Sequence, residues 1–107
     1  GMYLEFYKNG QLHIKANFKE NVLDGEYIAY HEYEFNIIEQ VKSKKYYKFG
    51  KLHGKYLEFD ENGRLRKEGI YVKGKLEGEY FNYDKNEELI KKIIYKNGIL
   101  VKVINIK

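Results

Sequence analysis

Histidines are the residues of this sequence with the clearest potential for catalysis or metal binding. His13, His31 and His53 are isolated from one another along the chain. His31 precedes Glu32 and Glu34, but the segment HEYEF lacks the second histidine of the metal-binding motif HExxH. Cysteine is absent, which excludes disulfides and thiolate zinc sites. These observations predict a protein that is not an enzyme and that has no catalytic residue, metal site or cofactor.

Glycine-rich segments and acidic pairs offer no alternative chemistry. GKLHGK and GKLEGE precede expected strands, whereas a phosphate-binding loop opens a helix. The pairs Asp60-Glu61 and Glu87-Glu88 fall at expected turns, where acidic residues are common and solvated. Neither feature predicts a site.

Lysines are concentrated in KSKKYYKFGK and in the region from residue 91 onward, and the formal net charge is +4. Four of them are candidates for contact with a polyanion or an anionic lipid: Lys42, Lys44, Lys45 and Lys48. The alternative, which we favour, is that they are solvated residues that keep a sheet soluble and protect its edges. Nucleic acid is the less favoured partner, because Tyr47 is needed for packing and only Tyr46 remains to stack on a base.

The apolar residues of segment 31–40 are the best candidates for contact with a partner protein. The segment reads HEYEFNIIEQ and contains Tyr33, Phe35, Ile37 and Ile38. Apolar residues on a protruding hairpin often mark a binding site. They are equally suited to fold back and cover one face of a single-layer sheet, so both interpretations stay open.

The elements that must position these residues come from a repeat that occupies most of the chain. YLEFYKNGQL at 3–12 and YLEFDENGRL at 56–65 align without a gap. We divide a single domain, residues 2–107, into copies at about 3–26, 27–55, 56–79 and 80–101, with a closing strand at 99–106. The second copy is longer than the others because it contains segment 31–40. Gly1 before Met2 has the form of a residue left by expression, so Met2 is the candidate native start.

Each copy predicts two short antiparallel strands and two tight turns. Asn62-Gly63 lies between two aromatic-apolar runs and predicts a type I′ turn, which needs positive φ at both central residues. The segment around Gly74 predicts the second turn. The structural positions of the repeat are Gly10, Gly25, Gly54, Gly63, Gly74, Gly78, Gly98, Tyr27, Tyr56 and Tyr80.

The recurring pattern Leu-x-Gly-x-Tyr suggests a specific packing arrangement. A glycine between two large residues leaves a gap in one face of a strand. We expect a ring from the neighbouring strand, such as Tyr71 or Tyr95, to lie across the bare backbone of Gly54 or Gly78.

The motif Tyr-x-x-aromatic-x-x-Asn-Gly-x-Leu, followed by aromatic-x-x-Gly-x-Leu-x-Gly, resembles the variant MORN repeat of bacteria. It is similar to the repeats of the YwqK-family antitoxins, and the resemblance covers roughly residues 3–100. It implies an elongated β-meander that acts as a binding module. In the antitoxin branch it implies neutralisation of a toxin by protein contact, and some MORN proteins are implicated in membrane or phospholipid association. Glu87 and Lys102 replace glycines of the pattern, so no functional residue is transferred.

We therefore predict an all-β fold, a single-layer antiparallel β-meander of about nine strands built from MORN-like β-hairpin repeats. The predicted function is a non-enzymatic protein–protein interaction module, with an antitoxin or immunity-like protein that binds a toxin as its sharpest form. The alternatives are a peripheral phospholipid-binding module and a scaffold fragment of a larger repeat array. A homo-oligomer through the edge or face of the sheet is a further expectation. No apolar run of spanning length and no signal-peptide pattern occurs, which indicates the cytoplasm, with the membrane periphery as the alternative.

Overall fold

Strands account for all the regular secondary structure in residues 1–32 and 40–107, the part of the chain that the computed structural model describes. No helix suited to crossing a membrane is found in this part of the chain. The strands are β1 (Met2–Phe6), β2 (Leu12–Lys19), β3 (Val22–Tyr30), β4 (Val41–Lys48), β5 (Lys51–Leu52), β6 (Gly54–Phe59), β7 (Leu65–Val72), β8 (Lys75–Leu76), β9 (Gly78–Tyr83), β10 (Leu89–Lys96) and β11 (Ile99–Asn105).

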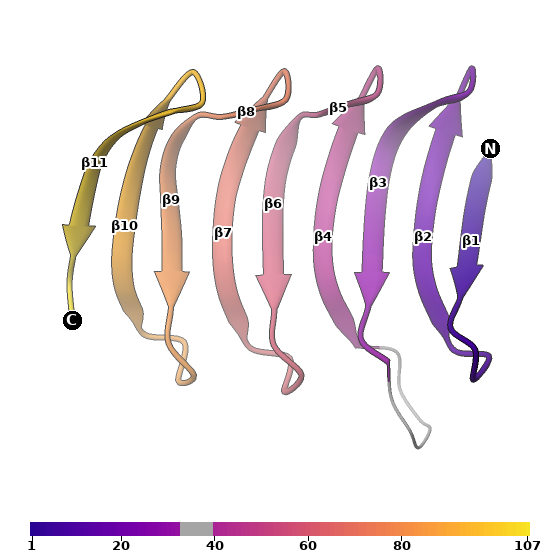
Figure 1. Ribbon diagram of the computed structural model, residues 1–107, viewed down its shortest axis with the longest axis horizontal. Coiled ribbons are helices and arrows are strands. Elements are labelled where there is room, and N and C mark those ends of the chain that lie inside the picture. Colours follow the sequence, from indigo (N-terminus) through magenta and orange to yellow (C-terminus); the bar gives the residue numbers. More distant parts are fainter. Residues whose placement is uncertain (33–39) are drawn as a thin grey trace.

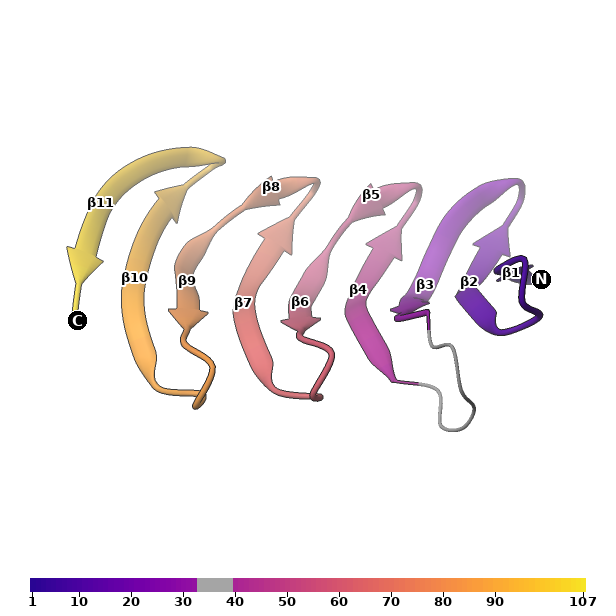
Figure 2. The same ribbon diagram turned by 60° about the horizontal axis from the view of Figure 1, so that its bottom comes forward.

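All of these strands belong to one antiparallel sheet in which chain order is also spatial order. The path runs β1-β2-β3-β4-β6-β7-β9-β10-β11, while the two-residue strands β5 and β8 pair with β4 and β7. Hairpin turns alternate between the two ends of the sheet, and the strands curve in the same sense (Figures 1 and 2). The extents are 42 × 36 × 14 Å, and the smallest is little more than the thickness of one layer. The predicted single-layer meander is confirmed.

The first turn of the third repeat differs from the type I′ turn that Asn62-Gly63 predicted. The backbone N–H of Gly63 donates to the carbonyl of Asp60, and among these residues Gly63 alone has positive φ, at 79°. The Asp60 carboxylate accepts the N–H groups of Asn62 and Arg64 at 2.9 and 3.0 Å. This pattern is that of a type I turn followed by one left-handed residue. The prediction was wrong because Asp60 caps a longer loop than a two-residue hairpin.

Type I′ geometry occurs instead at the second turn of each repeat. Both central residues have positive φ in all four cases: Glu20-Asn21, Phe49-Gly50, Lys73-Gly74 and Asn97-Gly98. Positive φ at two successive positions matches the right-handed twist of the flanking strands. The seven glycines named above as structural positions of the repeat all have positive φ, as does Gly50, and Asn21 takes the glycine position of the first copy with φ 68°.

Second turns also connect successive repeats through backbone hydrogen bonds. The N–H of Gly50 donates to the carbonyl of Leu23 at 2.8 Å, and the same bond recurs from Gly74 to Leu52 and from Gly98 to Leu76, at 2.7 and 2.9 Å. A side chain next to each leucine accepts a second N–H from the same turn. These pairs are Asp24 with Phe49, His53 with Lys73, and Glu77 with Asn97. The Leu-x-Gly segment of one repeat thus holds the turn of the next.

Gly54 and Gly78 are not covered by tyrosine rings as the sequence pattern suggested. A Cβ atom on Gly78 would meet nothing within 4 Å, and one on Gly54 would touch only Tyr46, at 3.6 Å. Both glycines have positive φ, at 110° and 82°, where the chain leaves the short strand β5 or β8. Glycine is required there because of its positive φ, not because a ring packs against it.

A ring does cover Gly69, the glycine that lies outside the repeat pattern. A Cβ atom there would come within 2.5 Å of Cδ2 of Tyr80 on β9, and Gly69 is buried. Ala16 has the equivalent place in the first copy, where it pairs with Tyr27 and is fully buried. Among the described residues only Ala16, Tyr30 and Gly69 are classed as buried, because a single layer has no second sheet to cover it.

Candidate functional site

Eight aromatic rings share one face of the sheet, which we call the aromatic face. They form four pairs, one in each repeat, with ring centroids 5.7–6.1 Å apart: Tyr3–Phe18, Tyr27–Tyr47, Tyr56–Tyr71 and Tyr80–Tyr95. Strand register produces this arrangement. Tyr3 pairs with Ala16, Ala16 with Tyr27, and Tyr56 with Gly69, so large rings alternate with small residues in the first and third repeats. The result is an aromatic surface that extends across the four repeats of a curved, single-layer sheet (Figure 2).

The rings are half-buried by their neighbours and remain open to solvent on one side. Burial raises the pKa of Tyr80 to about 12, and it raises the pKa of Tyr71 and Tyr47 above the ordinary value of 10. Lys45 interrupts the surface at the position that Ala16 and Gly69 occupy in other copies. Its Nζ atom lies 4.7 Å from the centre of the Tyr27 ring, and burial lowers its pKa.

A polar row lies beside the aromatic rings on the same face. Cross-strand pairing aligns Glu58 with Lys67, Lys67 with Asn82, and Asn82 with Lys91. These four positions have the same parity as Tyr56, Gly69 and Tyr80 on their strands, so they belong to the aromatic face. The row therefore crosses β6, β7, β9 and β10 next to the rings.

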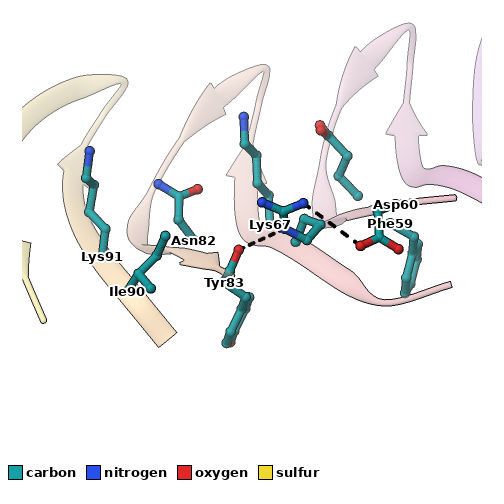
Figure 3. A pocket seen from close by; sticks show the side chains of 9 residues that line it. Phe59, Asp60, Lys67, Asn82, Tyr83, Ile90 and Lys91 are labelled. Carbon is teal, nitrogen blue, oxygen red and sulfur yellow. Dashed lines mark hydrogen bonds and ion pairs between the residues drawn. The ribbon is translucent and has the colours of Figure 1, made fainter. Parts of the chain in front are cut away.

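A shallow hollow of about 350 Å³ opens along this row, at the end nearest the first turns. We call it the polar hollow. Figure 3 shows the side chains of Lys67, Asn82 and Lys91 extending in the same direction, whereas the ring of Tyr83 points away from them. Its lining consists of Glu58, Phe59, Asp60, Arg66, Lys67, Asn82, Tyr83, Ile90 and Lys91.

Some charged groups of the polar hollow have hydrogen-bond or ion-pair partners, and others have none among the described residues. Glu58 accepts the hydroxyl of Tyr56 at 2.9 Å, and Asp60 is held by its turn, where the N–H of Arg64 is the main reason that its carboxyl pKa lies below 3.8. Arg66 donates from Nε to the carbonyl of Tyr83 at 2.9 Å and lies 3.9 Å from Asp60.

Two lysines and one amide of the hollow are left without such contacts. Lys67 and Lys91 form no ion pair with any residue in 1–32 or 40–107. The Oδ1 atom of Asn82, between them, is buried and has no hydrogen-bond donor among the described residues. Within the part of the chain that the structure describes, the hollow thus has a cation without an anionic partner on each side of an amide.

The four lysines that the sequence singled out do not form one patch. Lys44 and Lys48 lie on the face opposite to Lys45, because side chains alternate along β4. Lys42 falls at the bulge that shifts the register between β3 and β4. Lys44 pairs with Glu26 at 3.2 Å, and Lys45 stacks on Tyr27, whereas Lys42 and Lys48 are exposed. Lipid or polyanion contact through these residues stays a prediction.

The histidines have structural contacts in the described part of the chain. His13 lies 2.9 Å from Glu5 and stacks on Tyr7, His31 approaches the carbonyl of Phe59 at 3.1 Å, and His53 accepts the N–H of Lys73. Within residues 1–32 and 40–107, no three His, Asp or Glu side chains are grouped closely enough to hold a metal ion.

The predicted partner site at Tyr33, Phe35, Ile37 and Ile38 lies outside the described residues, as does Glu34. Sequence reasoning missed the polar hollow, although all of its residues were in view. Its signal is weak, because Lys67, Asn82 and Lys91 are separated by 15 and 9 residues and meet only through the register of three strands.

Comparison with known proteins identifies the repeat. The family described as MORN repeat variant matches residues 1–20, 52–73 and 76–97. No curated protein matches the chain. MORN repeats are non-catalytic modules that generally mediate interaction with proteins or membranes. Since the matched segments cover more than half of the 107 residues and coincide with the hairpins of the sheet, the chain belongs to the MORN repeat variant family.

Proposed function

We propose that this chain is a protein-binding module whose partner lies against the aromatic face. The observation that carries the proposal is the double row of eight rings on a face that no described residue covers. Tyrosine provides a large contact area and loses little conformational entropy on binding, which is why it is enriched in binding surfaces. The rings are already fixed in pairs, so their order is established before a partner arrives.

The sharpest form of this proposal is an antitoxin or immunity-like protein that acts in the cytoplasm. The similarity to the YwqK-family antitoxins supports it, together with a surface suited to contact and not to chemistry. Such a protein neutralises its partner by covering a functional surface. Affinity, and not turnover, then decides its activity.

Two adjacent residues of β7 offer a matched test of the binding face. Tyr71 is on the aromatic face, and Ile70, which is 49% exposed, points to the opposite face. A photoreactive benzoyl-phenylalanine at either position is used to capture partners in cells. We expect one specific cross-linked protein from position 71 and none from position 70. Equal capture from both positions, or capture from position 70 alone, would contradict the assignment of the face.

The antitoxin form is tested with the captured protein. Its expression alone should arrest growth, and co-expression of the wild-type chain should restore growth. Tyr71→Arg should fail to restore growth and Ile70→Arg should succeed, provided that thermal melts show both variants to be folded. A captured protein that leaves growth unchanged would refute the antitoxin form and leave the binding module intact.

Membrane lipid is the competing partner, because Lys42 and Lys48 are exposed on β4. Binding to anionic vesicles through these lysines would weaken steeply as salt is added. Vesicle binding that is abolished by Lys42→Gln/Lys48→Gln, with no cross-link from position 71, would replace the protein-binding proposal by the lipid one.

A further inference from the structure

We propose that the polar hollow binds an acidic side chain, Asp or Glu, of the protein that docks on the aromatic face. This inference rests on the proposed function, because it names a chemical feature of the same partner. Lys67 and Lys91 would hold the carboxylate as two cationic donors, with the amide of Asn82 beneath it.

The geometry of the row supports a ligand that bridges the two lysines. β9 separates β7 from β10, so Lys67 and Lys91 are roughly 9–10 Å apart at their backbones, which is two strand spacings. Long lysine side chains can converge over Asn82 from that distance, and Figure 3 shows the three side chains on the same side of the sheet. With Oδ1 of Asn82 buried, the Nδ2 group is the half of the amide that a ligand in the hollow would meet.

The charge of the hollow fits one monoanion. Its lining has three cations, Arg66, Lys67 and Lys91, and two carboxylates, Glu58 and Asp60. Both carboxylates are held by other groups, Glu58 by the Tyr56 hydroxyl and Asp60 by its own turn. A single carboxylate from a partner would neutralise the excess positive charge and receive charge-assisted hydrogen bonds.

The same charges favour a protein over a membrane as the source of the anion. A lipid surface would bring many phosphates against the hollow and place some of them over Glu58 and Asp60, where like charges repel. A protein can present one carboxylate between apolar contacts. The aromatic rings directly beside the hollow are suited to those contacts.

The test uses a small probe, so that it does not depend on finding the partner. Capped Gly-Glu-Gly peptide is titrated into the full chain at low salt, and the backbone and side-chain amide signals are followed by NMR. The controls are capped Gly-Gln-Gly peptide, inorganic phosphate and anionic vesicles. We expect the glutamate peptide to shift the signals of Lys67, Lys91 and the Asn82 side-chain amide in a saturable way, and the glutamine peptide to leave them unchanged.

Matched variants separate a built site from general electrostatic attraction. Lys67→Gln/Lys91→Gln removes both cationic donors and should weaken glutamate-peptide binding by at least about tenfold, since the loss of one charge-assisted contact alone has roughly that effect. Lys42→Gln/Lys48→Gln removes the same charge from exposed positions of β4 outside the hollow and should change affinity by less than about twofold, as expected for distant exposed charges. Equal losses in both variants, or stronger shifts with phosphate or vesicles than with the peptide, would overturn the inference.

The partner captured at position 71 gives an independent check. If Lys67→Gln/Lys91→Gln leaves its affinity unchanged while Tyr71→Arg abolishes binding, the acidic-side-chain inference fails and the proposed function survives. If the peptide binds as expected but no cross-link forms at position 71, the hollow is an acid-binding site and the proposed function fails.

Discussion

Substitution of Gly69 by alanine tests the packing of the aromatic face directly. Gly69 lies opposite Tyr56 on one side and under the ring of Tyr80 on the other. A Cβ atom at this position would stand 2.5 Å from Cδ2 and 3.1 Å from Cε2 of Tyr80. Carbon atoms pack best at about 3.5–4.0 Å, so the ring or the strand must move by roughly 1 Å.

Two opposing effects set the change in the free energy of unfolding that Gly69→Ala causes. Overpacking of this kind costs about 1–3 kcal/mol. The φ angle of Gly69 is not in the left-handed range, so alanine is otherwise tolerated and stabilises by about 0.4–1 kcal/mol through the unfolded chain. The clash is the larger effect, and we expect Gly69→Ala to lower the free energy of unfolding by about 1–2 kcal/mol. A domain of this size should then melt at least roughly 4 °C lower.

Urea unfolding of four proteins forms the assay: wild type, Gly69→Ala, Tyr80→Val and the double variant. Valine keeps a strand-forming side chain but lacks the ring atoms that would collide. In the Tyr80→Val background the alanine should therefore be neutral or stabilising, with a coupling energy of about 1–3 kcal/mol between the two sites. If Gly69→Ala raises the urea midpoint in the wild-type background, the ring-over-glycine argument is wrong at this position as well.

Three further predictions concern the turns and the rings. Gly78 has positive φ and open space around it, so Gly78→Val should lower the melting temperature more than Gly78→Asn does. Equal losses of melting temperature would contradict the argument that the backbone conformation requires glycine there. The N–H of Arg64 is the main donor that holds the Asp60 pKa below 3.8. The ionised Asp60 carboxylate therefore stabilises the folded state fully above pH 3.8, and this stabilisation is lost as the pH falls through the lower folded-state pKa. Urea midpoints of Asp60→Asn should vary less than those of wild type in that acid range. Burial raises the Tyr80 pKa from 10 to about 12, so the stability that it contributes should be complete below pH 10 and fall as the pH rises toward 12. Phenolate absorbance should show several late-ionising tyrosines, because the pKa of Tyr83 is also raised to about 12, and Tyr80→Phe should remove one of them.

The meander could be predicted because its signals are local and repeated. The copies share an alternation of large residues and most of their glycines, so a departure in one copy is recognised from the others. Leu89, Ile90, Ile93 and Ile94 also fit a helix, yet alignment with the other copies places them on a strand, as the structure has them in β10. In a single hairpin the choice between helix and strand would have stayed open, and the repetition of the pattern decided it.

Turn types could not be predicted as well, because they depend on hydrogen bonds outside the turn dipeptide. Asn62-Gly63 has the composition of a type I′ turn, but the Asp60 carboxylate selects a longer loop. Lys73-Gly74 has a weaker composition and is the true type I′ turn, held by the carbonyl of Leu52 in the preceding repeat. A dipeptide rule does not include these partners.

The site was harder to predict than the fold because its residues are brought together only by the pairing register of neighbouring strands. Gly69 looked like an exception to the repeat, yet it is where a ring crosses the backbone. Lys67 and Lys91 looked like ordinary surface lysines, yet pairing with Asn82 places them in one row. Bulges shift the register between strands, so the parity of a residue within its own strand does not say which residue it faces.

A single-layer sheet makes the same side chains responsible for stability and for binding. Very few described residues are fully buried, so the tyrosine pairs act as the core of the protein while one side of each ring is open. A partner on the aromatic face would complete the burial of those rings, and a ligand that binds only the folded state raises the free energy of unfolding by RT ln(1 + [L]/Kd). Partner binding should therefore raise the melting temperature of the chain. The shift should be lost in Tyr71→Arg and kept in Ile70→Arg, because only the first of these residues lies on the aromatic face.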